Sequence, residues 1–311
     1  MALVPFDNRD GVIWMDGALR PWNDARIHVC THALHYGSAV FEGQRVYDNH
    51  LFKCEEHTER LFESARLLGF SIPYTQAEIN AAIQETVTAQ GFRDGYVRPI
   101  AWRGSGQMGV SAPHAGIHVA IATWDWPSYF DAETKMKGIK LEIARWRRPD
   151  PRTSPCHSKA VGLYMICTLA KEEAESRGCA DALMFDWRDQ VAEATGANVL
   201  FVKGNTIHTP TPDCFLDGIT RRTVIALARQ RGFEVLERAI MPSELEDFEQ
   251  CFLCGTAAEV TPVGEIGPYR FEVGAVTKQL VQDYDDLVHR RVTLSSIPEP
   301  VKGAWPKAVA S

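Results

Sequence analysis

One lysine in this 311-residue chain stands apart from the ordinary surface lysines. Lys159 lies between Ser158 and Ala160, in a stretch of small and nearly uncharged residues. A lysine that is removed from water has a lowered pKa, and its neutral amine is a nucleophile. Exposed lysines sit beside acids instead, as Lys171 does beside Glu172. Lys159 is therefore a candidate catalytic amine, although its sequence neighbourhood is also compatible with a structural role.

Further residues with suitable chemistry follow Lys159 along the chain. Tyr164 comes five residues later, and Glu193 is an isolated acid. Residues 218–220 (Gly-Ile-Thr) open a predicted helix and offer an anion backbone N–H groups, a hydroxyl and the helix dipole; residues 255–257 (Gly-Thr-Ala) form a second turn of this type. An amine, a buried acid and a phosphate cradle together indicate pyridoxal 5'-phosphate (PLP). Taken singly, Glu193 could be a hairpin acid, Tyr164 a core aromatic and Thr220 a helix cap.

The bulk composition narrows the range of partners. A net charge of -7 and an isoelectric point near 5.8 argue against nucleic acid or an anionic membrane as the main partner. We interpret the one basic run, Arg145 to Arg152, as a solvated loop. No apolar run approaches the roughly 18 residues of a membrane span, and the N-terminus lacks the layout of a signal peptide. We therefore expect small-molecule partners.

Eight cysteines are scattered along the chain. A chain of this length needs no disulfides, so we expect reduced thiols and a cytoplasmic protein. Cys251 and Cys254 form a CxxC pattern, which invites a redox or zinc interpretation. Their context predicts a strand, where residues three apart point to opposite faces, so core cysteines are favoured. Since no second CxxC and no HExxH is present, we expect no metal site.

The pattern of turns and helix caps divides the chain into two domains with a connector between them. Residues 1–125 read as a small antiparallel α+β domain, residues 126–137 as the connector, and residues 138–311 as a larger domain with a loosely ordered tail at 295–311. The elements expected in the first domain are hairpins over 12–19 and 40–54, helices over 55–68 and 75–91, and strands over 96–103 and 117–124. Those expected in the second are strands over 139–144, 182–186, 191–193, 197–202, 206–208, 233–240 and around Cys251, and helices over 163–177, 218–231 (capped by Thr220) and 276–290.

From about residue 12 to 290, the chain resembles the fold type IV PLP enzymes, and among them the branched-chain amino acid aminotransferases. The motifs that carry the resemblance are residues 33–43 (ALHYGSAVFEG), 57–61 (HTERL), 96–99 (YVRP), 108–110 (MGV), 158–160 (SKA), 193–198 (EATGAN), 218–221 (GITR) and 255–262 (GTAAEVTP), in family order. The resemblance implies an α+β protein with the two-domain fold of D-amino acid aminotransferase, in which the C-terminal domain is mixed α/β. It also implies a homodimer or an assembly of dimers.

Carried over position by position, the resemblance implies a set of cofactor residues. Lys159 would form the Schiff base with PLP and act as the base for the 1,3-proton shift. Glu193 would pair with the pyridine nitrogen, and Tyr164 would lie near the phenolic oxygen. Leu216 would pack against the ring. The phosphate would be held by Arg60, Ile219, Thr220 and Thr256.

The same resemblance implies a substrate site. Tyr96 and the backbone amides of Thr256 and Ala257 would bind the substrate carboxylate. Arg98 would pair with the second carboxylate of glutamate or 2-oxoglutarate. The apolar side chain would lie among Phe41, Trp126 and Tyr129 together with, from across a dimer interface, Tyr36 and Val110.

The implied function is a ping-pong transamination between L-leucine, L-isoleucine or L-valine and 2-oxoglutarate. Departures from the family pattern at Ala39, at Trp102-Arg103, at residues 161–163 and at Ala197 leave the substrate range open. The alternatives are a D-amino acid or (R)-amine aminotransferase, an aminodeoxychorismate lyase, or a catalytically silent binding protein that keeps the fold.

Overall fold

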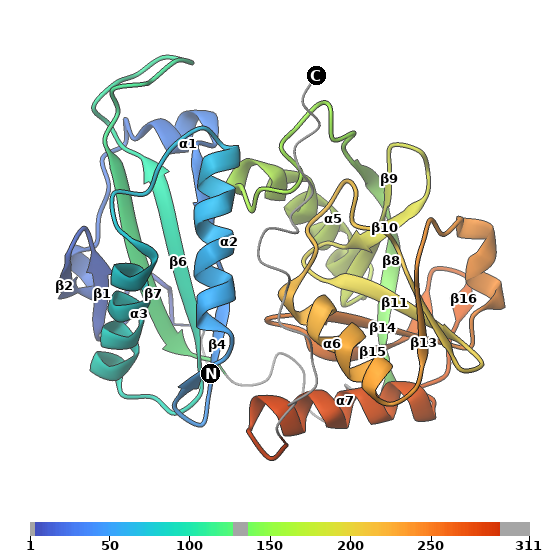
Figure 1. Cartoon of the computed structure of the whole chain (residues 1–311). Coiled ribbons are helices and arrows are strands. Elements are labelled where there is room, and N and C mark those ends of the chain that lie inside the picture. Colours follow the sequence, from blue (N-terminus) through green and yellow to red (C-terminus); the bar gives the residue numbers. More distant parts are fainter. Residues whose placement is uncertain (1–3, 127–135, 293–311) are drawn as a thin grey trace.

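The computed structural model describes residues 4–126 and 136–292. Two lobes lie side by side, each built on its own β-sheet (Figure 1). The strands of the first sheet fall between residues 12 and 125, and those of the second between residues 139 and 270. Most of the predicted connector, including Tyr129, and the tail at 295–311 lie outside the described residues.

The first sheet is antiparallel throughout, with the strand order β2-β1-β7-β6-β4-β5 and with β3 paired to β6. Its strands are β1 (Val12–Met15), β2 (Ala18–Pro21), β3 (Ala39–Phe41), β4 (Gln44–Tyr47), β5 (His50–Leu51), β6 (Gly95–Arg103) and β7 (Ile117–Asp125). The predicted Asp-Gly turn joins β1 to β2, and both Asp16 and Gly17 have positive φ.

The helices of the first lobe are η1 (Trp22–Asp24), α1 (His32–Tyr36), α2 (Cys54–Leu67) and α3 (Gln76–Gln90). Helices α2 and α3 cover one face of the sheet, where Leu61 and Ile83 pack against Val97 in a shared core. The capping box of Thr75 and Glu78 is confirmed at the start of α3.

The strand predicted over 40–47 is broken in the structure. Glu42 and Gly43 separate β3 from β4, although both strands still pair with β6. A Cβ on Gly43 would lie 1.9 Å from the Tyr96 hydroxyl, so only glycine fits here. The break was missed because the alternation of apolar side chains continues across it.

The second sheet is mixed: β8 runs parallel to β9 and β15, and β12 runs parallel to β13. Its strands are β8 (Ile139–Arg148), β9 (Asp181–Asp186), β10 (Val191–Ala194), β11 (Asn198–Lys203), β12 (Thr206–Thr209), β13 (Glu234–Glu237), β14 (Gln250–Gly255), β15 (Glu259–Ile266) and β16 (Tyr269–Arg270). Strands β15 and β16 were not predicted. Together the two lobes confirm the α+β class.

Helices α5 (Met165–Ser176), α6 (Ile219–Gln230) and α7 (Ala275–Val288) cover one face of the second sheet, and η3 (Pro242–Asp247) places Leu245 in the core on the other face. The short helix η2 (Val161–Tyr164) precedes α5. The core that contains α6 and α7 includes Cys254, whereas Cys251 belongs to the core on the opposite face, as predicted for core strand cysteines. All eight cysteines are free thiols. Among the described residues, no helix is long and apolar enough to cross a membrane.

The predicted cap of α6 is wrong by two residues. Gly218, not Thr220, is the N-cap, and it uses no side chain to cap the helix. A Cβ on Gly218 would lie 2.2 Å from Asn198 Oδ1, so the close approach of β11 requires glycine at this position. Thr220 lies inside the first turn, where its hydroxyl is free to bind Tyr284 instead.

Candidate active site

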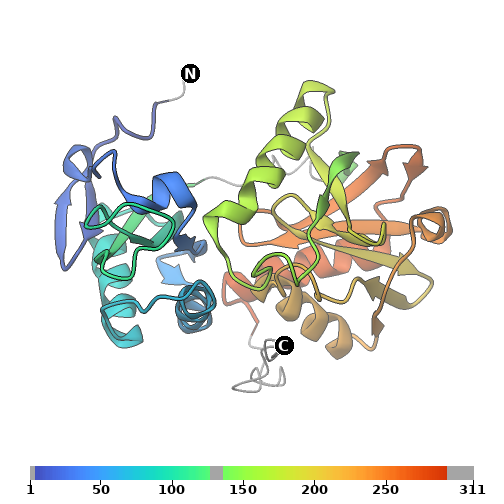
Figure 2. The same cartoon turned by 90° about the horizontal axis from the view of Figure 1, so that it is seen from above.

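A pocket between the lobes brings together residues that are far apart in sequence. Its wall combines part of α2 from the first lobe with η2, the β10–β11 turn, the start of α6 and the end of β14 from the second. Figure 2 shows the same two lobes side by side from above. The pocket is lined by all the predicted cofactor residues, namely Arg60, Lys159, Tyr164, Glu193, Leu216, Ile219, Thr220 and Thr256. Their roles toward a cofactor stay predictions.

Lys159 is held from the first lobe by its backbone. Its N–H donates to Ser64 Oγ at 3.0 Å, and its carbonyl accepts from the Phe41 N–H at 3.1 Å. These bonds tie the Lys159 segment to α2 and to β3, and they leave the side chain directed at the pocket, where Nζ lies 2.8 Å from the Tyr164 hydroxyl. Ser64 is a site residue that sequence reasoning missed, because nothing in the pattern of α2 distinguishes it.

The electrostatics around Lys159 favour its neutral amine. Burial and the nearby Arg60 guanidinium lower the pKa of Lys159 to about 8. Burial, followed by the Glu193 carboxylate, raises the pKa of Tyr164 above its usual range. The phenol therefore keeps its proton near neutral pH, while a substantial fraction of Lys159 can lose one, so the amine can act as nucleophile and base.

Glu193 is the buried acid of the pocket, with 9% of its surface exposed. Burial raises its pKa to about 7, although Arg148 and Lys159 act in the opposite direction. Asn198 Nδ2 donates to Glu193 Oε2 at 3.2 Å, and Arg148 Nε lies 3.4 Å from Oε1. A carboxyl group in this setting can pair with a basic ring nitrogen at neutral pH.

Arg148 corrects our interpretation of the basic run as a solvated loop. It is the last residue of β8, is only 4% exposed, and lines the pocket. Its Nε has no hydrogen-bond partner, although the guanidinium is close enough to Glu193 for an ion pair. In the sequence Arg148 cannot be distinguished from the neighbouring arginines, because only the course of β8 in the fold directs this side chain inward.

The start of α6 forms an anion cradle with Arg60. The N–H groups of Ile219 and Thr220 lie in the first turn of the helix and have no acceptor within it. Both residues line the pocket together with Thr256 and the Arg60 side chain. Free N–H groups, a helix dipole and a guanidinium are the donors that a phosphate group prefers, so the cradle fits the phosphate of PLP.

Four predicted substrate residues meet on the pocket side of the first sheet. Arg98 donates to the Tyr96 hydroxyl at 3.3 Å, and its guanidinium carbon lies 4.8 Å from the centroid of the Phe41 ring. The rings of Tyr96 and Trp126 are 5.4 Å apart. Lys159 Nζ lies 4.9 Å from the Phe41 ring centroid. This aromatic wall with an embedded cation is therefore adjacent to the amine.

The remaining substrate residues are placed differently. Ala257 follows Thr256 in the turn between β14 and β15. Tyr36 and Val110 are not among the residues that line the pocket, and they are 45% and 85% exposed. They are neighbours on the surface, because His32 of α1 binds the Gly109 carbonyl at 2.9 Å.

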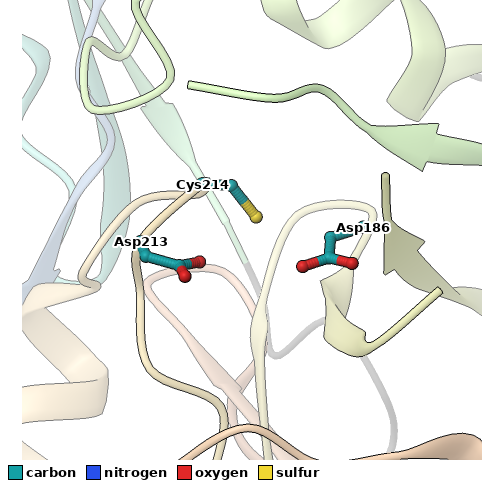
Figure 3. A group of neighbouring side chains, drawn as sticks. All are labelled: Asp186, Asp213 and Cys214. Carbon is teal, nitrogen blue, oxygen red and sulfur yellow. The ribbon is translucent and has the colours of Figure 1, made fainter. Parts of the chain in front are cut away.

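One group among the described residues has the composition of a metal site. Asp186, Asp213 and Cys214 point toward one another, as Figure 3 shows. Arg188 donates to both carboxylates, at 2.6 and 2.8 Å, and burial raises the pKa of the Cys214 thiol. The single Arg188 guanidinium balances one of the two carboxylate charges, and the raised pKa keeps the thiol protonated, so the contacts in this group are those of an ion-pair cluster.

The comparisons with known proteins agree with the pocket. The family described as amino-transferase class IV matches residues 39–266. The chain is 40% identical to the branched-chain-amino-acid aminotransferase of Pseudomonas aeruginosa, over 90% of this chain and 94% of the relative. The solved structure of the Escherichia coli branched-chain amino acid aminotransferase aligns with a TM-score of 0.89, at 33% identity, over 93% of this chain and 98% of that one. For the branched-chain amino acid aminotransferase of Thermobaculum terrenum in its PLP form, the TM-score is 0.83 at 31% identity, over 91% and 95% of the chains. The chain belongs to the class IV aminotransferases, and within them to the branched-chain-amino-acid aminotransferase family.

Proposed function

We propose that this enzyme transfers the amino group of L-leucine, L-isoleucine or L-valine to 2-oxoglutarate, with PLP as cofactor and by a ping-pong mechanism. The observation that carries the proposal is the position of Lys159: its Nζ lies 2.8 Å from the Tyr164 hydroxyl, in a pocket shared with the Glu193 carboxylate. The solved Thermobaculum terrenum relative in its PLP form supports the choice of cofactor.

Each part of PLP has a counterpart in the pocket. Arg60, Thr256 and the first N–H groups of α6 are suited to its phosphate. Glu193 is suited to its pyridine nitrogen and Tyr164 to its phenolic oxygen, with Leu216 beside the ring. Bound PLP would supply a protonated ring that withdraws electrons from the α-carbon of an attached amino acid.

Lys159 performs two tasks in this proposal. Its amine would hold the cofactor aldehyde covalently and would be released when an amino acid takes its place. The freed Nζ would then be the base that moves the proton from the substrate α-carbon to C4′. A pKa of about 8 suits both tasks, because the neutral and protonated forms are both available near neutral pH.

The substrate site must accept an apolar and an acidic side chain in turn. Phe41 and Trp126 offer apolar contacts for a branched chain. Arg98 lies on the same wall, at 4.8 Å from the Phe41 ring, where it can pair with the second carboxylate of glutamate. Tyr96 and the backbone amides of Thr256 and Ala257 would hold the carboxylate that both substrates share.

The proposed working unit is a homodimer. Val110 and Tyr36 are apolar or aromatic side chains that expose 85% and 45% of their surfaces. Nearby, Val29 and Leu34 are also strongly exposed. A second copy that covers this surface would bring Tyr36 and Val110 of the partner subunit to the apolar end of the substrate site.

A half-reaction experiment tests the proposal. The PLP-loaded enzyme is mixed in parallel with L-leucine, D-alanine and (R)-1-phenylethylamine, and the visible absorption of the cofactor is followed. We expect rapid loss of the band with L-leucine, and restoration of the band by 2-oxoglutarate. Loss with D-alanine or the (R)-amine but not with L-leucine would assign the enzyme to another fold type IV activity.

A further inference from the structure

A fully buried carboxylate lies directly behind the anion cradle. Glu42 occupies the break between β3 and β4, and none of its surface is exposed. Arg60 donates to it twice, from Nε at 2.6 Å and from Nη2 at 2.9 Å. His57 Nδ1 lies 2.7 Å away, and the Gly43 N–H donates at 3.2 Å. Burying a carboxylate costs free energy unless an opposite charge and hydrogen bonds compensate for the lost water.

The charges around Glu42 identify Arg60 as its main partner. Burial alone would raise the pKa of Glu42, but Arg60 and His57 hold it well below its usual range, so Glu42 is ionised. Burial lowers the pKa of His57, which is therefore neutral, and its Nδ1 must carry the proton that faces the carboxylate. One negative charge thus faces one cation, Arg60, and two neutral donors, His57 and the Gly43 N–H.

The geometry leaves part of Arg60 free. A guanidinium has about five N–H donors in one plane, of which the side-on contact with Glu42 uses two. Nη1 and the remaining N–H of Nη2 lie in the same plane, along the edges of the guanidinium that do not face Glu42. Arg60 itself is only 4% exposed and lines the pocket, so we infer that these remaining donors face the pocket.

We propose that Glu42 is a positioning residue, which fixes the Arg60 guanidinium so that its free donors face the cofactor phosphate. This inference rests on the proposed function, in which Arg60 holds the phosphate of PLP. Glu42 also lies next to Phe41, whose N–H holds the Lys159 carbonyl at 3.1 Å. One short segment therefore places both the phosphate donor and the reactive lysine.

The proposal predicts different effects on the binding of PLP and of pyridoxal, two ligands that differ only in the phosphate. Apoprotein carrying Glu42→Gln keeps the shape of the side chain but removes its charge. Binding of PLP and of pyridoxal, which lacks the phosphate, is measured for this variant and for the wild type by absorbance titration. We expect the affinity for PLP to fall about tenfold or more, because hydrogen bonds to charged groups are lost from a fixed position. The affinity for pyridoxal stays within about twofold, because its other contacts are untouched.

Matched variants keep the result interpretable. Glu55→Gln makes the same change at an exposed position of α2 and leaves both affinities unchanged. Glu42→Asp keeps the charge but shortens its reach, and we expect an intermediate loss for PLP; it also serves as the reporter if Glu42→Gln does not fold. Equal losses for PLP and pyridoxal in both variants, or no loss for either ligand, would contradict a positioning role.

Arg60→Lys distinguishes this proposal from the proposed function. If this variant binds PLP and pyridoxal in the wild-type ratio, Arg60 does not hold the phosphate, and the assignment of the cradle fails together with the role of Glu42. If Arg60→Lys changes the ratio but both Glu42 variants keep it, only the role of Glu42 is wrong.

Discussion

Two ionisable side chains in the pocket have pKa values that are shifted toward each other. Burial lowers that of Lys159 to about 8 and raises that of Glu193 to about 7. In water, these groups would differ by about six pKa units. Groups with such pKa values can gain and lose protons at working pH, which is what acid–base catalysis needs.

The rate of covalent loading with PLP should depend on pH through Lys159. Only the neutral amine attacks the cofactor aldehyde, and its fraction grows as pH rises through a pKa of about 8. We expect the loading rate of apoprotein, followed by stopped-flow absorbance, to rise from pH 6 to 9 and then level off. A rate that keeps rising until pH 10 or above would show that Lys159 is solvated like an ordinary lysine, whose pKa is about 10.4.

Residue roles could be predicted only where a motif carries them. Lys159 and Glu193 were proposed from their chemistry and then from motifs of the family, Arg60 from a motif alone, and the structure places all three in one pocket. Arg148 and Ser64 were missed, because each acts through a partner that is close only in the folded chain. For side chains of this kind, the residues next to them in the sequence do not indicate their role.

At the scale of elements, features set by adjacent residues were predicted correctly, and features set by contacts with another element were not. The capping box of α3 and the turn between β1 and β2 formed as predicted, since each depends on neighbouring residues alone. The cap of α6 was misplaced, because Asn198 of another strand decides it. At the break between β3 and β4, the need for glycine at residue 43 likewise comes from Tyr96 on another strand.

The start of α6 offers a test of the cradle at this scale. In Gly218→Ala the new Cβ would lie 2.2 Å from Asn198 Oδ1. Because Asn198 is held by Glu193 and the Leu216 carbonyl, we expect the first turn of the helix to move. We expect PLP affinity, measured by fluorescence titration, to fall about tenfold or more as N–H groups leave the phosphate.

Thr75→Ala is the control for a change at a helix start. It removes the capping box of α3, far from the pocket, and should lower the free energy of unfolding by about 1 kcal/mol. Its PLP affinity should equal that of the wild type. If Gly218→Ala also kept full affinity, the start of α6 would not bind the cofactor.

At the scale of the whole molecule, the pocket depends on how the two lobes are joined. The Tyr47 hydroxyl donates to Glu259 Oε1 at 3.1 Å, and His289 Nδ1 lies 2.6 Å from Asp48 Oδ2. These contacts tie the β4–β5 hairpin to the second lobe. Together with the bonds from Ser64 and Phe41 to Lys159, they hold the two lobes that form the pocket in a fixed position relative to each other. No sequence pattern indicated them.

The proposed dimer gives a prediction for the exposed surface around α1. Leu34 is 61% exposed on this helix, and a charge there would be buried by a second copy. Leu34→Glu should sediment as a monomer and lose most transaminase activity, since Tyr36 and Val110 of the partner subunit no longer reach the site. Leu236→Glu, on β13 in the other lobe, should do neither. An active Leu34→Glu monomer would mean that one chain forms a complete site.

The central claim is that Lys159 carries the cofactor, and covalent labelling tests it most directly. The PLP-loaded enzyme is reduced with borohydride and digested, and the phosphopyridoxyl group is located by mass spectrometry. We predict a single label on Lys159, and no label in Lys159→Ala, which should also be inactive. A label on another lysine, or full activity in Lys159→Ala, would contradict the account.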